Sequence, residues 1–231
     1  MTRARFITFE GGEGSGKTTQ IQRLLARLRP VVGEVVVTRE PGGSIGGEQI
    51  RNLLVNGPPE RWSAETEALL MYAARRDHIE RLIQPALRKG AWVISDRFHD
   101  SSRAYQGAAG GAPVALIDAL EHNVLEGLKP DLTLLFDLSV DDSTTRTRRR
   151  TNGTYRADRL DSENAEFHSR VREAYLQLAA AEPERIKVIK TDQPLELTHE
   201  SVKALVVPFL QSRGHACDPE VEFTLPSETE I

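Results

Sequence analysis

The fold of this chain is decided by the stretch Gly11-Gly12-Glu13-Gly14-Ser15-Gly16-Lys17-Thr18-Thr19. The stretch follows a short apolar run at residues 6–9 and fits the phosphate-binding loop pattern G-x-x-x-x-G-K-[ST] from Gly11 to Thr18. Glycines allow a tight turn in which backbone N–H groups approach an anion closely. A helix that begins after the loop would direct its positive dipole end and its free N–H groups at the same point. The residues from Gly11 to Thr19 are therefore predicted to bind the phosphates of a nucleoside triphosphate.

Two side chains of this loop have separate expected roles. Lys17 can reach the β- and γ-phosphates, and the hydroxyl of Thr18 can ligate Mg²⁺. The alternative is a glycine-rich turn that matches the pattern by chance. The apolar run before the loop and the helical spacing of apolar residues after it disfavour that alternative. The spacing is formed by Ile21, Leu24, Leu25 and Leu28.

The composition is that of an ordinary globular protein, with 39% hydrophobic and 28% charged residues. A length of 231 residues suits one domain with at most a lid. The net charge of −4 disfavours general binding of nucleic acid. No run approaches the roughly 18 apolar residues that a membrane span requires, and the first apolar run is short for a secretory signal. The single cysteine, Cys217, excludes an intramolecular disulfide. We therefore expect a cytoplasmic protein without nucleic-acid or membrane partners.

Segments rich in β-branched residues alternate along the chain with segments of helical periodicity. This alternation predicts an α/β fold of the P-loop NTPase type, in which helices flank a doubly wound, five-stranded parallel sheet and ligands bind at the carboxyl ends of strands. The expected strands are residues 6–9, 34–39, 92–95, 131–137 and 186–189. The expected helices follow the phosphate loop and then cover residues 46–54, 63–87, 114–125, 140–150, 162–181 and 195–210.

Further features of the chain are expected from its pattern. Pro85 is expected to kink or end the helix at 63–87, and residues 107–113 are expected to form a loop of small residues. One domain is expected over residues 1–213, with a lid at about residues 141–161. Residues 214–231 are acidic and are expected to form a disordered tail.

Charged residues stand where the predicted strands end. Asp96 follows an apolar strand, at the place where NTPases put the carboxylate that holds Mg²⁺ directly or through water. It could instead cap the next segment. Arg97 beside it suits a second anionic group, which indicates a phosphate acceptor. Three more arginines are expected at the same end of the sheet, where guanidinium groups bind phosphate through forked hydrogen bonds. These are Arg39, Arg51 and Arg75, and for Arg51 a solvated surface position is equally plausible.

A dense basic segment follows the fourth predicted strand. We interpret it as a lid whose arginines close over a transferring phosphoryl group, with an exposed basic face or a nucleic-acid patch as alternatives. Its arginines are Arg146, Arg148, Arg149, Arg150, Arg156 and Arg159.

Three motifs together resemble those of thymidylate kinases: GGEGSGKTT at residues 11–19, TREPGG at 38–43 and DRFHDSSRAYQG at 96–107. The resemblance extends from about residue 5 to about residue 210. It implies transfer of the ATP γ-phosphate to dTMP with Mg²⁺, which gives dTDP for dTTP synthesis, and it implies a homodimer. Another nucleoside monophosphate kinase is the alternative within the class. A regulatory GTPase is disfavoured because the chain contains no N-K-x-D guanine motif.

The resemblance also assigns site residues. It implies that Lys17 and Thr18 hold the ATP phosphates and the metal, and that Glu13 touches the acceptor's sugar or the metal shell. Arg97 would grip the dTMP phosphate, and Arg75 would contact thymine. The remaining acceptor positions that it implies are Arg39, Glu40, Pro41, Arg51, Ser102 and Tyr105, of which Tyr105 would crowd a ribose 2′-hydroxyl.

Two positions and the arginines of the lid define the variant of the family pattern. Met71 stands where an aromatic residue usually stacks on thymine. Gly14 stands where some members carry an arginine in the phosphate loop, so the arginine-rich lid resembles the common bacterial arrangement. Arg146 and Arg150 are the expected catalytic lid residues, with Arg159 behind them.

Overall fold

This computed structural model describes residues 5–150, residue 159 and residues 163–217, with the backbone alone for residues 59 and 148–150. Within these residues, five strands form one sheet in the order β2-β3-β1-β4-β5, and all of its pairings are parallel. The predicted α/β fold with a five-stranded parallel sheet is confirmed. The strands are β1 (Phe6–Gly11), β2 (Val35–Arg39), β3 (Trp92–Asp96), β4 (Leu132–Asp137) and β5 (Ile186–Lys190).

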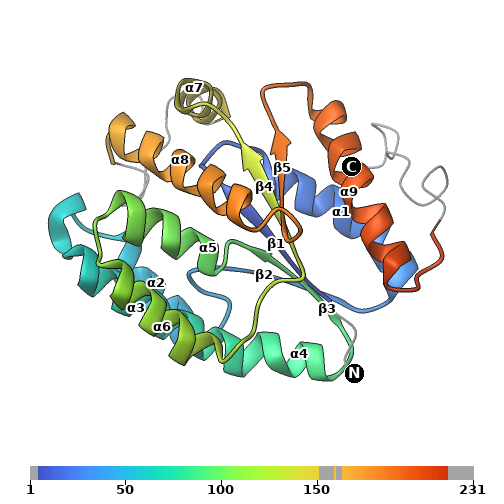
Figure 1. The fold of residues 1–231 in the computed structure, drawn as a ribbon, viewed down its shortest axis with the longest axis horizontal. Coiled ribbons are helices and arrows are strands. Elements are labelled where there is room, and N and C mark those ends of the chain that lie inside the picture. The colour runs from blue at the N-terminus through green and yellow to red at the C-terminus, as the bar shows by residue number, and fades with distance from the viewer. Residues whose placement is uncertain (1–4, 151–158, 160–162, 218–231) are drawn as a thin grey trace.

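Helices connect successive strands and cover both faces of the sheet (Figure 1). The α-helices are α1 (Lys17–Val32), α2 (Ile45–Val55), α3 (Ala64–His78), α4 (Gln84–Arg88), α5 (His99–Ser102), α6 (Val114–Leu125), α7 (Val140–Arg150), α8 (Ala165–Ala181) and α9 (Leu195–Ser212). A 3₁₀ turn, η1 (Pro59–Arg61), and two π-helical segments, η2 (Ile79–Ile83) and η3 (Arg103–Ala109), complete the described helices. In the described part of the chain, no helix is long and apolar enough to cross a membrane.

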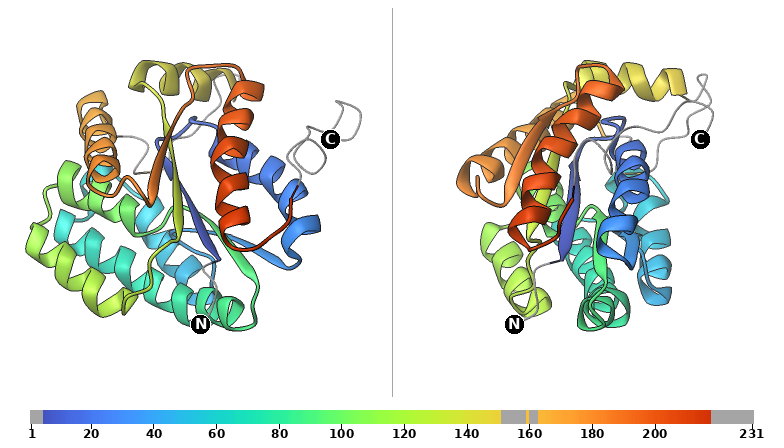
Figure 2. Two further views of the ribbon diagram at one scale, coloured as in Figure 1. Left: turned by 45° about the vertical axis from the view of Figure 1, so that its right-hand side comes forward. Right: turned by 90° about the vertical axis from the view of Figure 1, so that its right-hand side faces the viewer.

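Alternating side chains of the strands pack into separate apolar clusters on the two faces. Ile7 and Phe9 of β1 pack with α1 and α9 on one face. Phe6 of β1 and Val93 of β3 pack with α3, η2 and α6 on the other. On that second face, a third cluster joins β4 and β5 to η3 and α8. Figure 2 shows α1 and α9 on one side of the sheet and α8, α3 and α6 on the opposite side. Both faces are therefore buried, as a parallel sheet requires.

The carboxyl ends of the three neighbouring strands β2, β3 and β1 bring the predicted charged residues together. Phe9, two residues before the phosphate loop, lies opposite Asp96 in the pairing of β1 with β3. Arg39 lies opposite Asp96 in the pairing of β2 with β3. The backbone N–H of Glu40 donates to the carbonyl of Asp96 at 2.9 Å. The phosphate loop and the polar ends of β2 and β3 thus face one edge of the sheet, above which α7 lies (Figure 1).

The helix expected over residues 63–87 is interrupted before Pro85. Helix α3 runs to His78, continues as η2 and resumes as α4, in whose first turn Pro85 lies. Pro85 has no N–H with which to bond the carbonyl of residue 81. The chain widens by one residue there, because the N–H of Gln84 donates to the carbonyl of Ile79 instead. The expected break is present as a π-helical segment.

The loop expected at residues 107–113 begins later, because residues 99–109 are helical. Helix α5 passes directly into η3, which ends at Ala109. This segment lacks an apolar period, since His99, Asp100 and Ser101 are polar although all three are buried. Their partners are other polar groups, which hydrophobic patterning does not detect.

The first residues of the expected acidic tail pack against the domain. His215 lies edge-on to Trp92, with ring centroids 5.5 Å apart, and Cys217 is buried in the cluster under α9. The acidic residues 218–231 lie outside the described residues, where disorder stays a prediction.

Candidate active site

One cavity joins the phosphate loop to the ends of β2 and β3 and to a wall formed by α2, α3, α5 and η3. It brings together nearly all the predicted site residues. The predicted residues that line it are Glu13, Gly14, Ser15, Gly16, Lys17, Thr18, Thr19, Arg39, Glu40, Pro41, Arg51, Met71, Arg75, Asp96, Arg97, Ser102 and Tyr105. The lining residues that the sequence reasoning missed are Val55, Phe98, Ser101 and Gln106.

At the phosphate-loop end, the backbone shapes the site. Gly14 and Gly16 adopt left-handed φ values of 69° and 94°, which glycine adopts without strain. The ammonium of Lys17 donates to the carbonyls of Gly11 and Gly12, at 3.0 and 2.9 Å. Burial, with Arg97 nearby, lowers the pKa of Lys17 to about 8. Gly11 and Gly12 therefore hold Lys17 from behind rather than line the cavity.

Helix α7 packs directly on this loop. The hydroxyl of Ser143 donates to the carbonyl of Glu13 at 2.6 Å. A Cβ on Gly14 would lie 2.8 Å from Oγ1 of Thr147 and 3.0 Å from the carbonyl oxygen of Ser143. A side chain at position 14 would collide with α7 in this arrangement, so the arginine that some family members carry in the loop has no room here.

Of the two expected catalytic arginines of the lid, Arg146 does not line the cavity. Arg146 of α7 donates to the backbone carbonyl of Thr191, at the end of β5. The side chain of Arg150 lies outside the described residues, as do residues 151–158. Arg159 is buried in the wall behind the cavity, where its Nε donates to the carbonyl of Leu54 at 2.7 Å and its guanidinium pairs with Glu67.

Arg97 stands at the junction between the phosphate loop and the opposite wall. Its backbone has a left-handed φ of 72°, which is unusual for a residue other than glycine, and its N–H donates to the carbonyl of Phe9 at 2.9 Å. Its Nη1 lies 3.4 Å from Oγ of Ser101 and 3.3 Å from the hydroxyl of Tyr175. Its Cζ lies 5.1 Å from the ring centroid of Tyr105. The guanidinium therefore reaches the cavity from a fixed backbone position.

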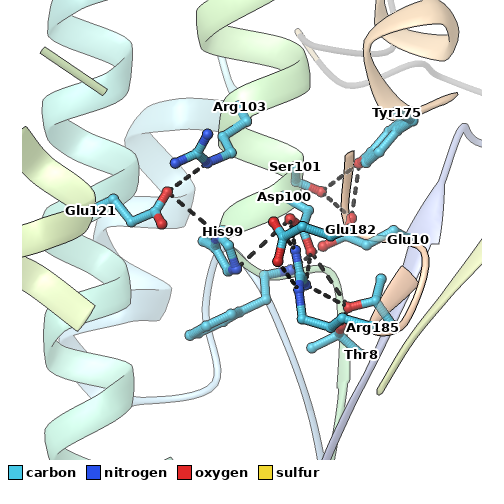
Figure 3. A network of polar contacts seen from close by, with 12 residues as sticks. Thr8, Glu10, His99, Asp100, Ser101, Arg103, Glu121, Tyr175, Glu182 and Arg185 are labelled. Atoms are coloured by element: carbon cyan, nitrogen blue, oxygen red, sulfur yellow. Dashed lines mark hydrogen bonds and ion pairs between the residues drawn. The ribbon is translucent and has the colours of Figure 1, made fainter. Parts of the chain in front are cut away.

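A buried carboxylate, Glu10, organises the surroundings of Arg97. Figure 3 shows Glu10 with Ser101 and Tyr175, the two residues that also contact Arg97. Glu10 accepts hydrogen bonds from the N–H of Phe98 at 2.8 Å, the hydroxyl of Ser101 at 2.6 Å and the hydroxyl of Tyr175 at 2.8 Å. Burial and then the charge of Asp100 raise the pKa of Glu10 to about 7. Glu10 was not among the predicted site residues. One signal could have identified it: Glu10 is a charged residue inside an apolar strand and lies next to the phosphate loop.

Behind Ser101, a second polar layer fixes helix α5 (Figure 3). The guanidinium of Arg185 donates to both oxygens of Asp100, at 2.7 and 2.8 Å. Glu121 accepts from Nε of Arg103 at 2.6 Å and lies 3.4 Å from Nδ1 of His99. These contacts tie α5 and η3 to α6 and to the start of β5, so the residues that face the cavity are held from behind.

At the far end of the cavity, Arg75 is held at two of its three nitrogens. Its Nε donates to Oε2 of Glu40 at 2.7 Å, and its Nη2 donates to the carbonyl of Phe98 at 3.1 Å. The Arg75 Cζ lies 4.6 Å from the ring centroid of Tyr72. Its Nη1 and the hydroxyl of Ser102 are buried and find no hydrogen-bond partner among the described residues. Both groups belong to residues that line the cavity, where a ligand could satisfy them.

The other two predicted arginines have internal partners. Nη2 of Arg39 donates to both oxygens of Glu48 at 3.0 Å and is exposed. Nη1 of Arg51 donates to the carbonyl of Pro41 at 2.9 Å, so Arg51 is part of the wall rather than a freely solvated arginine. Met71 is buried in the wall of the cavity.

The residues that could hold a metal ion are Thr18 and Asp96, which both line the cavity. A hydroxyl and a carboxylate are oxygen donors of the kind that Mg²⁺ prefers. Residues 5–150, 159 and 163–217 contain no group of three or more acidic, histidine or cysteine side chains that could form a complete metal cage. This donor set fits Mg²⁺, which usually takes its other ligands from phosphates and water.

The chain was compared with known proteins. Its sequence matches the family described as thymidylate kinase over residues 9–202. It is 53% identical over 207 residues to the thymidylate kinase of Caulobacter vibrioides, covering 90% of this chain and 98% of that protein. It is 47% identical over 215 residues to the thymidylate kinase of Methylococcus capsulatus, covering 93% and 100%. The crystal structure of the thymidylate kinase of Ehrlichia chaffeensis is similar with a TM-score of 0.71 at 34% identity, covering 88% of this chain and 98% of that chain. The resemblance seen in the three motifs is thereby confirmed: the chain belongs to the thymidylate kinase family.

Proposed function

We propose that this protein transfers the γ-phosphoryl group of ATP to the phosphate of dTMP and produces dTDP. One observation carries the proposal: a single cavity joins a phosphate loop to an acceptor chamber that is lined by Arg97 and Arg75. Membership of the thymidylate kinase family supports ATP as the donor and dTMP as the acceptor.

The donor end of the cavity suits the triphosphate of ATP. The loop presents backbone N–H groups at the start of α1, where the helix dipole favours negative charge. Lys17 enters the cavity beside the loop and would neutralise the β- and γ-phosphates. Thr18 and Asp96 are the residues that would hold Mg²⁺, which when bound neutralises part of the charge on the phosphates.

The acceptor end suits a monophosphate and its base. Arg97 can bind the dTMP phosphate through a forked pair of hydrogen bonds. Arg75 and Ser102 present a donor and a hydroxyl, both without partners in the described structure, to the polar edge of a base. Met71 can cover one face of that base through dispersion. Tyr105, which is buried in the chamber wall, leaves little room for a ribose 2′-hydroxyl.

The proposed phosphoryl transfer joins two anionic substrates, ATP and dTMP, which would bind end to end in the cavity. A phosphate oxygen of dTMP attacks the γ-phosphorus in line, the bond from that phosphorus to the bridging oxygen breaks, and ADP leaves. No general base is required, because the attacking oxygen already carries negative charge. Lys17 and Arg97 would stabilise charge on the transferring group from two sides. Arg146 and Arg150 would add charge when the lid, about residues 141–161, closes and excludes water.

A substrate panel tests this function. Coupled ATP turnover is measured with dTMP, dUMP, dCMP, AMP and GMP, and we expect kcat/KM to be highest for dTMP. Preference for another monophosphate would support the alternative of a different nucleoside monophosphate kinase. ATP hydrolysis without phosphorylation of any monophosphate would contradict both.

Three further expectations belong to the same proposal. Size-exclusion chromatography with light scattering tests the homodimer that the family resemblance implies. Cell fractionation tests the cytoplasmic location. Deletion of residues 218–231 tests the tail proposed to lie outside the kinase domain of residues 1–213: it should spare turnover, and it keeps His215 and Cys217, which pack against the domain.

A further inference from the structure

A buried histidine, His78, lies one layer behind the acceptor chamber. It is the last residue of α3, is fully buried and does not line the cavity. Its Nδ1 lies 2.9 Å from Oε1 of Glu40, and its Nε2 lies 2.7 Å from Oγ1 of Thr38. Both nitrogens of the ring are therefore committed to side chains near the end of β2.

Glu40 is shared between His78 and Arg75. Its Oε1 faces His78, while its Oε2 accepts from Nε of Arg75 at 2.7 Å. Burial alone would raise the pKa of Glu40, but Arg75 and then His78 outweigh burial and hold it below the usual value. An ionised carboxylate only accepts hydrogen bonds, so Nδ1 of His78 carries the proton. The hydroxyl of Thr38 can donate or accept, and it satisfies Nε2 in either case.

Because Glu40 bonds both His78 and Arg75, it sets the orientation of the Arg75 guanidinium. A carboxylate and a guanidinium prefer to join through two parallel hydrogen bonds. Here His78 occupies the second carboxylate oxygen, so Glu40 bonds only Nε, and Nη2 of Arg75 bonds the carbonyl of Phe98 at 3.1 Å. Without His78, Oε1 of Glu40 would be free to turn toward Nη2 and to rotate the guanidinium. Nη1, which is buried and has no hydrogen-bond partner among the described residues, would then point elsewhere.

We infer that His78 is a positioning residue for acceptor binding, because it holds Glu40 so that Arg75 presents Nη1 to the base of the monophosphate. Thr38 completes the chain of contacts by fixing the ring. This inference rests on the proposed function, since it assigns a role toward the same acceptor. It extends the acceptor site to a residue that touches no substrate.

The test uses two amide variants that each imitate one ring nitrogen. In His78→Asn, the amide nitrogen occupies about the place of Nδ1 and can still donate to Glu40. In His78→Gln, the amide nitrogen occupies about the place of Nε2 and can reach Thr38 instead. We expect His78→Gln to raise KM for dTMP about tenfold, the scale of a lost hydrogen bond to a charged group, and His78→Asn to stay within about threefold of wild type. Both variants should keep the wild-type KM for ATP.

The two variants differ little in size and polarity, so a merely structural role would affect them alike. Equal KM values for dTMP in both would overturn the inference, as would equal increases in KM for dTMP and ATP. Circular dichroism and thermal unfolding establish that each variant is folded.

A second pair leaves the histidine in place, in case substitutions in α3 prevent folding. Thr38→Val removes the hydroxyl that fixes Nε2, and Thr38→Ser keeps it. We expect Thr38→Val to raise KM for dTMP severalfold more than Thr38→Ser, and equal values would count against the inference. If wild-type protein phosphorylates dTMP but the pairs do not differ, only the role of His78 fails. If wild-type protein does not phosphorylate dTMP, the proposed function itself fails.

Discussion

The two ends of the cavity are built by different means. At the donor end, consecutive residues of one loop form the site, and Lys17 is held by the carbonyls of Gly11 and Gly12. At the proposed acceptor end, the candidate binding groups are two arginine side chains, each surrounded by a buried polar network. Glu40 holds Arg75 directly, and the neighbours of Arg97 converge on Glu10.

The difference follows from what each end is proposed to bind: a triphosphate common to many nucleotides at the donor end, and one particular monophosphate at the acceptor end. A loop of backbone amides can bind the phosphates of any nucleoside triphosphate, because it reads charge and little else. An acceptor site must recognise one base and one sugar, so it needs donors at fixed positions. Fixed positions require partners in the protein interior, where a hydrogen bond also fixes direction.

The largest expected effect comes from removing one cation at each end. Lys17→Ala and Arg97→Ala should each lower kcat/KM about 10³-fold, because each removes charge that faces the transferring group. The two variants should differ in their Michaelis constants: Lys17→Ala should raise KM for ATP, and Arg97→Ala should raise KM for dTMP. Steady-state kinetics with each substrate varied in turn measures the split.

An exposed arginine outside the cavity provides the control for this experiment. Arg170 of α8 is exposed, pairs with Glu166 and donates to the carbonyl of Ala109, so Arg170→Ala should retain nearly full activity. Wild-type-like turnover in Lys17→Ala or Arg97→Ala would count strongly against the proposed function. If Arg97→Ala raised KM for ATP but not for dTMP, Arg97 would act at the donor end, which would contradict its proposed role toward dTMP.

The same difference explains what the sequence could predict. The donor end is contiguous, so its residues could be identified from one local pattern. The acceptor residues that line the cavity could be identified because the motifs TREPGG and DRFHDSSRAYQG include most of them. Glu10 and Tyr175 are 165 residues apart in the chain, and no periodicity or local pattern connects residues at that separation.

Buried polar networks are the part of the fold that patterning fails to predict. Apolar periodicity does not predict the helical segments at residues 99–109, because His99, Asp100 and Ser101 are buried polar residues. Their side chains face Glu121, Arg185 and Glu10 rather than apolar groups. The place of His78 in the acceptor site could not be predicted for the same reason, because its partners are the buried polar side chains of Glu40 and Thr38. The five strands were placed correctly because their buried faces are apolar, which is the signal that sequence patterns record.

An effect of intermediate size is expected from the buried carboxylate behind Arg97. An acid whose pKa is raised in the folded protein holds its proton more tightly when folded. Glu10 therefore favours folding while it is protonated, and its contribution is lost as pH rises from 4.5, its ordinary pKa, to about 7. The loss amounts to as much as about 3 kcal/mol in the free energy of unfolding.

Urea unfolding at several pH values, with Glu10→Gln as the matched variant, measures this contribution. The uncharged amide cannot ionise, so the variant should lack this component of the pH dependence. Wild-type protein should lose stability relative to the variant between pH 4.5 and 7. A difference between the two proteins that stays constant over this range would show that Glu10 is not the group responsible.

The smallest expected effect concerns the contact between Met71 and the face of the base. Met71 lines the cavity at the position that the family usually gives to an aromatic residue. A phenylalanine there would add stacking worth about 0.5–1.5 kcal/mol, so Met71→Phe should lower KM for dTMP about threefold and leave KM for ATP unchanged. Met71→Leu, which changes shape without adding a ring, should not lower it. An unchanged or raised KM in Met71→Phe would mean that the flexible thioether fits the base at least as well as a rigid ring does. The specificity of the acceptor end would then depend on Arg75 and Ser102, which recognise the edge of the base, rather than on contact with its face.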